Sequence, residues 1–304
     1  MRKAFFQKLE KIAKENKDIF LLVGDLGRKF FQNFKGLDPK RFINTGVAEA
    51  NMIGVAAGLS MSGKNVYCYS IIPFLLMRTF EQIRIDVCYN KLNVKLLGAG
   101  SGFTYGLEGI THHAIEDIAI LRVLPYMTIV APGDAREAEA LAEASFNYQS
   151  PLYIRFGRDR ESVVHEKEIK FEIGKGIFVN EGKDICLLAT GTMLQTGKIV
   201  LKNLISRGLN PTLISLHTIK PLDENLIRNC SQNYKSIFTL EEHSIIGGLG
   251  SAVAEILAEN NFSGKFKRIG IKDVYSPYIG GPEYLLKKLG LDPESITNFI
   301  LKEI

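Results

Sequence analysis

Short apolar runs that end in glycine or a polar residue constrain the fold of this 304-residue chain most strongly. The run Ile19-Phe20-Leu21-Leu22-Val23 is followed at once by Gly24-Asp25. A strand buried on both faces of a parallel sheet has this composition, whereas a strand with one wet face alternates apolar and polar residues. Four more segments of the first half are predicted strands: 66–70, 94–98, 127–132 and 152–156. Helical patterns separate them, at about 4–16, 47–59, 75–88, 114–121 and 133–147, and this alternation predicts an α/β fold with a mostly parallel sheet.

A second unit of the same kind follows. Predicted strands at 184–189, 211–216, 236–240 and 266–270 alternate with helical segments, and two short helices are expected from residue 282 onward. The polar and charged segment 157–170 is the expected linker. Because 46% of the 304 residues are hydrophobic, the chain can fill two cores. We therefore expect two open, mostly parallel-sheet α/β domains, residues 1–162 and 163–304.

Charge and cysteine content narrow the functional classes. The net charge is +5, and the Lys and Arg residues are scattered rather than gathered in a basic stripe, so no nucleic-acid partner is expected. No apolar run approaches the roughly 18 residues of a membrane span, and the N-terminus has the pattern of an amphipathic helix rather than a signal peptide. The four cysteines lie in apolar segments without CxxC spacing, which predicts buried free thiols and a cytoplasmic location.

The segment Arg41–Leu59 holds the most unusual residue of the chain. It is predicted to form a short strand, a turn at Gly46 and a helix that is nearly all small or apolar and therefore buried. Glu49 lies in the first turn of that helix, and a buried carboxylate must be paired, hydrogen-bonded or protonated. From the residues alone two interpretations stay open: Glu49 completes the helix start and favours its dipole, or it carries chemistry. The small residues along the helix suit close contact with another element or subunit.

This segment, with Gly46-Val47-Ala48-Glu49 before an Ala-Ala-Gly-Leu helix, resembles the pyrimidine-binding domain of transketolases and of 1-deoxyxylulose-5-phosphate synthase. The resemblance continues through Tyr69-Ser70, Thr111-His112 and Val130-Ala131-Pro132. In the last third, Thr239–Ser251 is similar to the C-terminal domain of the same enzymes. The likeness covers nearly the whole chain, but only the second half of a full-length transketolase.

The resemblance implies thiamine diphosphate as the cofactor and assigns four residues to it. Glu49 is expected to hydrogen-bond the aminopyrimidine ring nitrogen and so to activate the cofactor, which serves as an electron sink. Phe74, or a residue next to it, is expected to stack on the aminopyrimidine; the alternative is an ordinary core phenylalanine. Asp25 and Arg78 fall on positions close to the cofactor.

The resemblance also implies residues that bind the substrate. His112 falls on a family histidine that contacts the substrate near its reactive carbon, and it is expected to assist proton transfers, with His113 beside it. Glu108 stands where the family has an aspartate that binds a sugar hydroxyl. Arg155 and Arg158 match arginines that bind a sugar phosphate; the alternative is that both form salt bridges at the domain edge.

Two departures from the family pattern are informative. Ser101 replaces a substrate-binding His or Arg, so the sugar is expected to differ from the usual sugar phosphates. The family also holds the diphosphate through a divalent metal, using Gly-Asp-Gly and a later Asn, and this chain has only Gly24-Asp25-Leu26. Glu241-Glu242-His243 does not replace that site, because three adjacent residues of a strand cannot all face one ion. We expect a separate N-terminal-type subunit to supply Mg²⁺ and diphosphate binding, in an α2β2 assembly.

The resulting hypothesis is the C-terminal-type subunit of a split transketolase, which moves a two-carbon ketol unit between sugars or sugar phosphates. One alternative is the β subunit of a 2-oxo acid dehydrogenase, which shares the fold and the glutamate. The other is a non-catalytic interaction subunit.

Overall fold

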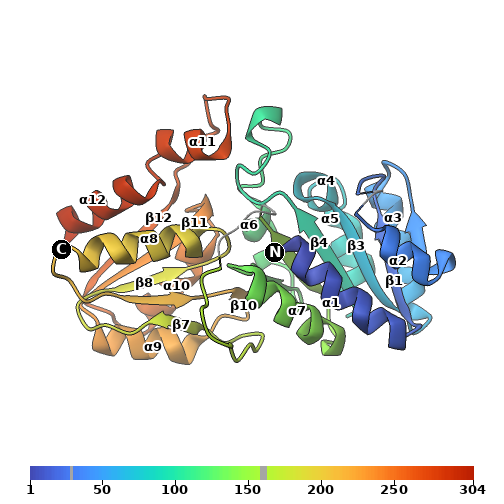
Figure 1. Ribbon diagram of the computed structural model, residues 1–304, viewed down its shortest axis with the longest axis horizontal. Coiled ribbons are helices and arrows are strands. Elements are labelled where there is room, and N and C mark those ends of the chain that lie inside the picture. The colour runs from blue at the N-terminus through green and yellow to red at the C-terminus, as the bar shows by residue number, and fades with distance from the viewer. Residues whose placement is uncertain (28–29, 158–162) are drawn as a thin grey trace.

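The computed structural model describes residues 1–27, 30–157 and 163–304 and consists of two α/β lobes, each built around one sheet (Figure 1). The first sheet has the strand order β10-β5-β6-β4-β3-β1-β2. Its strands are β1 (Ile19–Val23), β2 (Phe42–Asn44), β3 (Asn65–Ile71), β4 (Val94–Ala99), β5 (Thr128–Val130), β6 (Leu152–Phe156) and β10 (Thr218–Lys220). All neighbours pair in parallel except β10, which runs antiparallel to β5.

Helices cover both faces of the first sheet. These are α1 (Arg2–Glu15), α2 (Gln32–Leu37), η1 (Pro39–Arg41), α3 (Glu49–Met61), α4 (Ile72–Leu76), α5 (Phe80–Gln82), the π-helix η2 (Ile83–Tyr89), η3 (Gly106–Glu108), α6 (Asp117–Arg122) and α7 (Ala135–Asn147). The apolar sides of α1 and α7 fill one core, whereas α3, α4, α6 and η2 fill the core on the opposite face.

The second lobe is built in the same way. Its sheet has the order β12-β11-β8-β9-β7, with β7 (Ile177–Asn180), β8 (Cys186–Ala189), β9 (Thr212–Ser215), β11 (Ser236–Ser244) and β12 (Lys265–Ile271). The helices are α8 (Met193–Ile205), α9 (Glu224–Asn233), α10 (Leu249–Glu259), α11 (Pro282–Lys288) and α12 (Pro293–Glu303). One core packs under α8, α11 and α12 and another under α9 and α10. The predicted fold class is confirmed.

Several expected elements have different limits. The predicted helix 75–88 begins earlier and is divided into α4, α5 and η2. The helix expected from residue 114 begins at Asp117, because Ala114 forms an antiparallel bridge with Gly102. Two short strands, β7 and β10, were not predicted, and β10 completes the sheet of the first lobe although it follows four elements of the second.

The expected linker is partly packed against the first lobe. The backbone N–H groups of Val164 and His165 both donate to Oδ2 of Asp134, at 2.8 and 2.9 Å, and the imidazole of His165 lies 2.6 Å from Glu137. Asp134 also caps the start of α7 through its other oxygen. The first part of the second lobe is therefore held by buried carboxylates of the first.

Helix α3 is buried on one face only, which corrects the expectation of a fully buried helix. Met52, Ile53, Ala56 and Ala57 point into the core. The opposite side is exposed and is formed by mostly small or apolar residues: Val47, just before the helix, then Ala50, Asn51, Gly54, Gly58 and Met61.

No helix within the described residues is both long and apolar enough to cross a bilayer. All four cysteines are buried free thiols, as predicted.

Candidate functional site

Glu49 lies where the carboxyl ends of β1 and β3 meet the first turn of α3. Its side chain is only 1% exposed. The Ser70 hydroxyl, at the end of β3, donates to Oε1 at 2.9 Å, and the guanidinium of Arg78 reaches Oε2 at 3.4 Å. The carboxyl ends of parallel strands are where open α/β sheets bind ligands. The carboxylate is therefore held in place by hydrogen bonds at the ligand-binding edge of the sheet.

Gly24 leaves room for this arrangement. It follows β1 directly, and a Cβ atom there would lie 3.0 Å from Oγ of Ser70 and 3.2 Å from Oε1 of Glu49. Both distances are shorter than ordinary van der Waals contacts, so a side chain at this position would push against the pair. The glycine after the strand thus serves the geometry of the carboxylate.

A half-buried aromatic ring stands beside the carboxylate. The guanidinium carbon of Arg78 lies 4.6 Å from the ring centroid of Phe74, and the imidazole of His112 meets the same ring edge-on at 5.0 Å. The Thr111 hydroxyl lies 2.9 Å from Nδ1 of His112, so Nε2 is the ring nitrogen that an incoming ligand would meet. Four of the predicted residues, Glu49, Phe74, Arg78 and His112, are thus brought together.

A cavity of about 390 Å³ opens next to this group. It is lined by Arg2, Leu26, Gly27, Phe30, Tyr69, Ile71, Tyr105, Glu108 and His112. Arg2 was not among the predicted site residues; its guanidinium donates to the Tyr69 hydroxyl at 2.9 Å. Its place in the first turn of an amphipathic helix gave no signal, because only the tertiary packing of α1 beside β3 brings the cation to the cavity.

Asp25 lies at the same edge of the sheet, in a left-handed backbone conformation with φ of 54°. Its carboxylate accepts a hydrogen bond from the Asn44 amide at 2.8 Å, and its N–H donates to the same side chain at 3.1 Å. Asp25 therefore joins the loop after β1 to the end of β2, just before the connection that leads to Glu49.

Two predicted substrate residues are buried away from the cavity. Ser101 is 2% exposed, and its carbonyl accepts from the Thr104 hydroxyl. His113 is 3% exposed, packs edge-on against Phe103 and lies 3.4 Å from the carbonyl of Gly106. Burial lowers the pKa of His113. In this structure both residues support the loop after β4.

Arg155, for which phosphate binding and a salt bridge were both expected, forms a buried ion pair. Its Nε donates to Oδ2 of Asp117 at 2.7 Å, and its Nη2 donates to the carbonyls of Ala114 and Glu242 at 2.7 and 3.0 Å. Burial alone would raise the pKa of Asp117, but the guanidinium beside it holds that pKa below its usual range. Since Arg155 is 2% exposed, the salt-bridge interpretation describes it. Arg158 lies outside the described residues.

Within the described ranges, no three His, Cys, Asp or Glu side chains gather in a way that suits a metal ion. Glu241 and Glu242 have other partners. Glu241 accepts from the first N–H groups of α10, those of Leu249 and Gly250, and burial raises its pKa to about 7.

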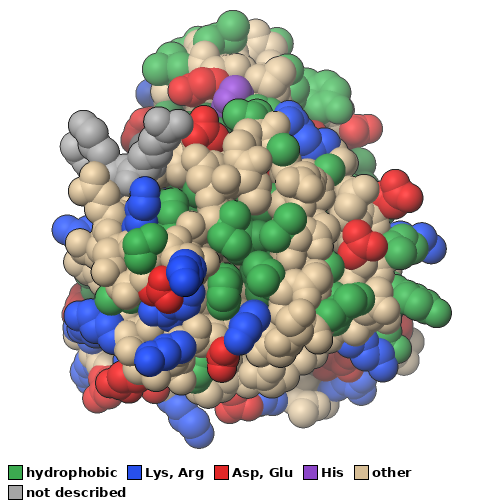
Figure 2. All heavy atoms as spheres, turned by 90° about the vertical axis from the view of Figure 1, so that its right-hand side faces the viewer, with side chains coloured by type: hydrophobic (Ala, Val, Ile, Leu, Met, Phe, Trp, Pro, Cys, Tyr) green, Lys and Arg blue, Asp and Glu red, His purple; other side chains and the backbone are tan. Residues whose placement is uncertain are grey.

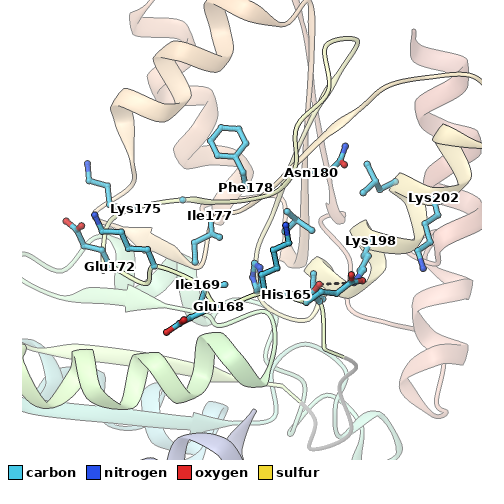
Figure 3. Close-up of a pocket in the computed structure, with 17 residues that line it drawn as sticks. His165, Glu168, Ile169, Glu172, Lys175, Ile177, Phe178, Asn180, Lys198 and Lys202 are labelled. Atoms are coloured by element: carbon cyan, nitrogen blue, oxygen red, sulfur yellow. Dashed lines mark hydrogen bonds and ion pairs between the residues drawn. The ribbon is translucent and has the colours of Figure 1, made fainter.

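Another cavity, of about 870 Å³, lies between segment 164–180 and α8. Figure 3 shows lysines and glutamates mixed around it. Lys198 pairs with Glu166 at 3.1 Å. This cavity contains none of the predicted site residues, and its lining carries positive and negative side chains together rather than charges of one sign. The predicted site residues favour the smaller cavity, which Glu108 and His112 line.

The exposed side of α3 belongs to an apolar face of the first lobe. Figure 2 views the lobe from the side on which α3 lies, and hydrophobic side chains gather near the middle of that face. Met77, Ile85 and Tyr89 are exposed on the neighbouring segment, and η2 packs against α3. We call α3 with these residues the α3 face; it begins at the residue that carries the site.

Comparisons with known proteins identify the family of the chain. The transketolase pyrimidine-binding domain family matches residues 1–161, and the transketolase C-terminal domain family matches residues 174–296. The chain therefore belongs to the transketolase family, and its two domains are those of the C-terminal half of a transketolase.

Relatives of the same length are separate transketolase subunits. A subunit of the apulose-4-phosphate transketolase of Phocaeicola vulgatus is 35% identical over 99% of this chain and 96% of that protein. A solved structure described as "Split gene transketolase, inactive beta4 tetramer" has a TM-score of 0.89 and 36% identity, covering 99% of this chain and 97% of that one. By contrast, 1-deoxy-D-xylulose-5-phosphate synthase of Clostridium botulinum is 34% identical over 99% of this chain, which spans only 48% of it. The chain thus corresponds to a subunit of the split type.

Proposed function

We propose that this chain is the C-terminal-type subunit of a thiamine diphosphate-dependent transketolase, which transfers a two-carbon ketol unit between sugar or sugar-phosphate substrates. The observation that carries the proposal is Glu49, a buried carboxylate fixed by Ser70 at the carboxyl edge of the sheet beside the half-buried ring of Phe74.

These residues fit the aminopyrimidine half of the cofactor. The carboxylate of Glu49 would hold the ring nitrogen, and the face of Phe74, which now carries the guanidinium of Arg78, offers a flat surface for stacking. When bound, thiamine diphosphate supplies the electron sink for breaking and forming the carbon–carbon bond of a ketol unit. Arg78 and Asp25 flank this position and are proposed to contact the cofactor or to order the loops around it.

The cavity that His112 lines is the proposed substrate site. His112 would meet the substrate through Nε2 and hold or release a proton at its oxygen, which is general acid–base work. Arg2 would attract an anionic group such as a phosphate, and Glu108 would accept a hydrogen bond from a sugar hydroxyl. With Ser101, His113 and Arg155 buried, the cation that the structure offers to an anionic substrate in this cavity is Arg2, among the residues that it describes.

The α3 face is the proposed docking surface for an N-terminal-type transketolase subunit, in an α2β2 assembly. Its apolar composition and small residues permit close approach, and it adjoins Glu49. That partner would supply the ligands for Mg²⁺ and the diphosphate. The solved relative described as a tetramer of β chains is called inactive, which is consistent with a need for a second kind of subunit. A cytoplasmic location is proposed from the buried free thiols.

The test is purification of the chain from its own cells together with whatever binds it, followed by titration of thiamine diphosphate and Mg²⁺ and an assay of ketol transfer. We expect tight cofactor binding in the complex alone, and loss of turnover in Glu49→Gln. Glu143→Gln, a change in an exposed carboxylate of α7 that pairs with Lys8, is the matched control and should leave turnover intact.

Two other outcomes would favour the alternatives. Decarboxylation of a 2-oxo acid without ketol transfer would indicate the β subunit of a 2-oxo acid dehydrogenase, which the comparisons do not favour. Failure of every assembly to bind the cofactor would indicate an interaction subunit.

A further inference from the structure

The loop after β4 carries three residues of the candidate cavity and is closed at its base by a small bridge. Tyr105, Glu108 and His112 lie within residues 102–114, which we call the substrate loop. Gly102 and Ala114 pair as an antiparallel bridge, with N–H···O distances of 2.9 and 3.0 Å in the two directions. The position of the three cavity residues therefore depends on how this base is held.

Each strand of the base is held by a buried charged side chain. On the returning strand, Arg155 donates to the carbonyl of Ala114. On the outgoing strand, Oε1 of Glu242 accepts the N–H of Phe103 at 2.8 Å. Glu242 comes from β11 of the second lobe, and its own carbonyl accepts from Arg155, which joins the two holding residues.

The carboxylate of Glu242 is itself fixed on the second lobe. Its Oε2 accepts the hydroxyl of Thr192, at the start of α8, at 2.6 Å, and the side chain is 5% exposed. A charged acceptor for a buried N–H makes a strong hydrogen bond, and its loss would leave that N–H without a partner.

Gly102 makes room for this contact. Its φ is +57°, a conformation that favours glycine, and a Cβ atom there would collide with the carboxyl group of Glu242. Gly102 thus allows the carboxylate of Glu242, from the other lobe, to approach the base of the loop closely. This contact lies outside the cavity.

We infer that Glu242 is a positioning residue: the second lobe uses it to hold the substrate loop, so that Tyr105, Glu108 and His112 face the cavity beside Glu49. The effect on activity rests on the proposed function, whereas the contact itself does not. The second lobe would then contribute to substrate binding without touching the substrate.

Hydrogen–deuterium exchange on the full chain tests the contact directly. In Glu242→Ala we expect the amides of residues 103–113 to exchange about tenfold faster, since one buried hydrogen bond to a charged group is lost. Glu242→Gln keeps an oxygen for Phe103 and an amide for Thr192, and should restore most of the protection. In Gly102→Ala the new methyl group displaces the carboxylate of Glu242, so the loop amides should exchange as fast as in Glu242→Ala. This variant provides the test if Glu242→Ala does not fold.

The matched control is Glu137→Gln, because Glu137 is also fully buried and bonded at the junction of the lobes, to His165 and the N–H of Gly133, away from this loop. Unchanged loop exchange in both Glu242→Ala and Gly102→Ala, or equal acceleration in the control, would overturn the inference.

Activity of the assembled enzyme gives the second readout. We expect Glu242→Ala to raise KM for the sugar about tenfold while the affinity for thiamine diphosphate stays unchanged, and Glu242→Gln to restore KM. The two proposals can fail separately. If the loop exchanges faster in Glu242→Ala but the wild-type complex shows no ketol transfer, the proposed function is rejected and the positioning role of Glu242 is retained.

Discussion

The guanidinium of Arg78 lies over the ring of Phe74, 4.6 Å from its centroid, and also reaches Glu49. A planar cation in this place marks the surface that a planar ring would use, because aromatic faces attract cations and other rings alike. Arg78 is about half exposed, so it can turn away when a ligand enters.

Removal of this ring is expected to weaken cofactor binding. Phe74→Ala should lower the affinity of the assembled enzyme for thiamine diphosphate about tenfold, since a stacking contact and its buried area are lost. Phe74→Tyr keeps the ring and is the control. Calorimetric titration of the cofactor measures the affinity of both variants. Equal affinities in the Ala and Tyr variants would indicate that Phe74 is an ordinary core residue that does not stack on the cofactor.

Gly24 allows a more local test of the carboxylate. In Gly24→Ala the new methyl group presses on Ser70 and Glu49, and displacement of a catalytic group by about 1 Å can cost about 100-fold in rate. We expect turnover to fall by that order, with little change in the free energy of unfolding. Gly36→Ala on α2, where a Cβ would meet nothing within 4 Å, should retain full turnover. Steady-state rates of the two variants test this prediction, and equal turnover in Gly24→Ala and Gly36→Ala would contradict it.

Gly54 separates the stability of the chain from its assembly. It lies in the middle of α3 on the exposed side, and a Cβ there would meet nothing within 4 Å in this chain. Gly54→Ala should therefore stabilise the isolated chain by about 0.5–1 kcal/mol through helix propensity.

If a partner docks on the α3 face, Gly54→Leu should weaken the complex by about tenfold or more while leaving the isolated chain folded, because the leucine side chain would occupy the space that the partner needs. Denaturant unfolding and sedimentation measure the two effects, and a complex indifferent to Gly54→Leu would exclude this face.

The Arg155–Asp117 pair predicts a pH dependence of stability. Because the pKa of Asp117 is lower in the folded protein than the usual 3.8, its contribution to stability is complete above that value and is lost as the pH falls through the folded pKa. Asp117→Asn should lower the free energy of unfolding at pH 7 by about 3–5 kcal/mol, since it leaves a buried guanidinium without its counter-charge. The variant should also lose less stability than the wild type between pH 4 and pH 2. Chemical denaturation across this range checks both statements, and parallel curves for the two proteins would contradict the second.

The sequence predicted most of the fold because buried parallel strands are nearly pure apolar runs. Ile19–Val23 and the strand from Val94 show this directly. The three residues of β10, by contrast, precede Pro221 and carry a lysine, so no periodicity distinguishes them from a turn. Only their pairing with β5 makes them a strand.

Part of the candidate site could be predicted from the sequence, where one residue type differed from its surroundings. Glu49 was identified because a carboxylate interrupted an apolar helix, and its burial is confirmed. Arg2 and Ser70 are ordinary in their local sequence, and only the packing of distant segments brings them to the candidate site. Arg155 shows the opposite case: an arginine at a strand end is compatible with a phosphate site or a salt bridge, and only the folded structure shows that it is buried and paired with Asp117.

The antiparallel strand β10 has a consequence for how the protein is made. The first lobe is encoded first, yet the edge of its sheet at β5 is covered by residues 218–220, which lie beyond three strands and a helix of the second lobe. During translation that edge stays open until residue 220 has left the ribosome, and an open edge pairs readily with foreign strands. Until then the first lobe has an open strand edge at β5, and we expect the nascent chain to be most prone to aggregate in this interval.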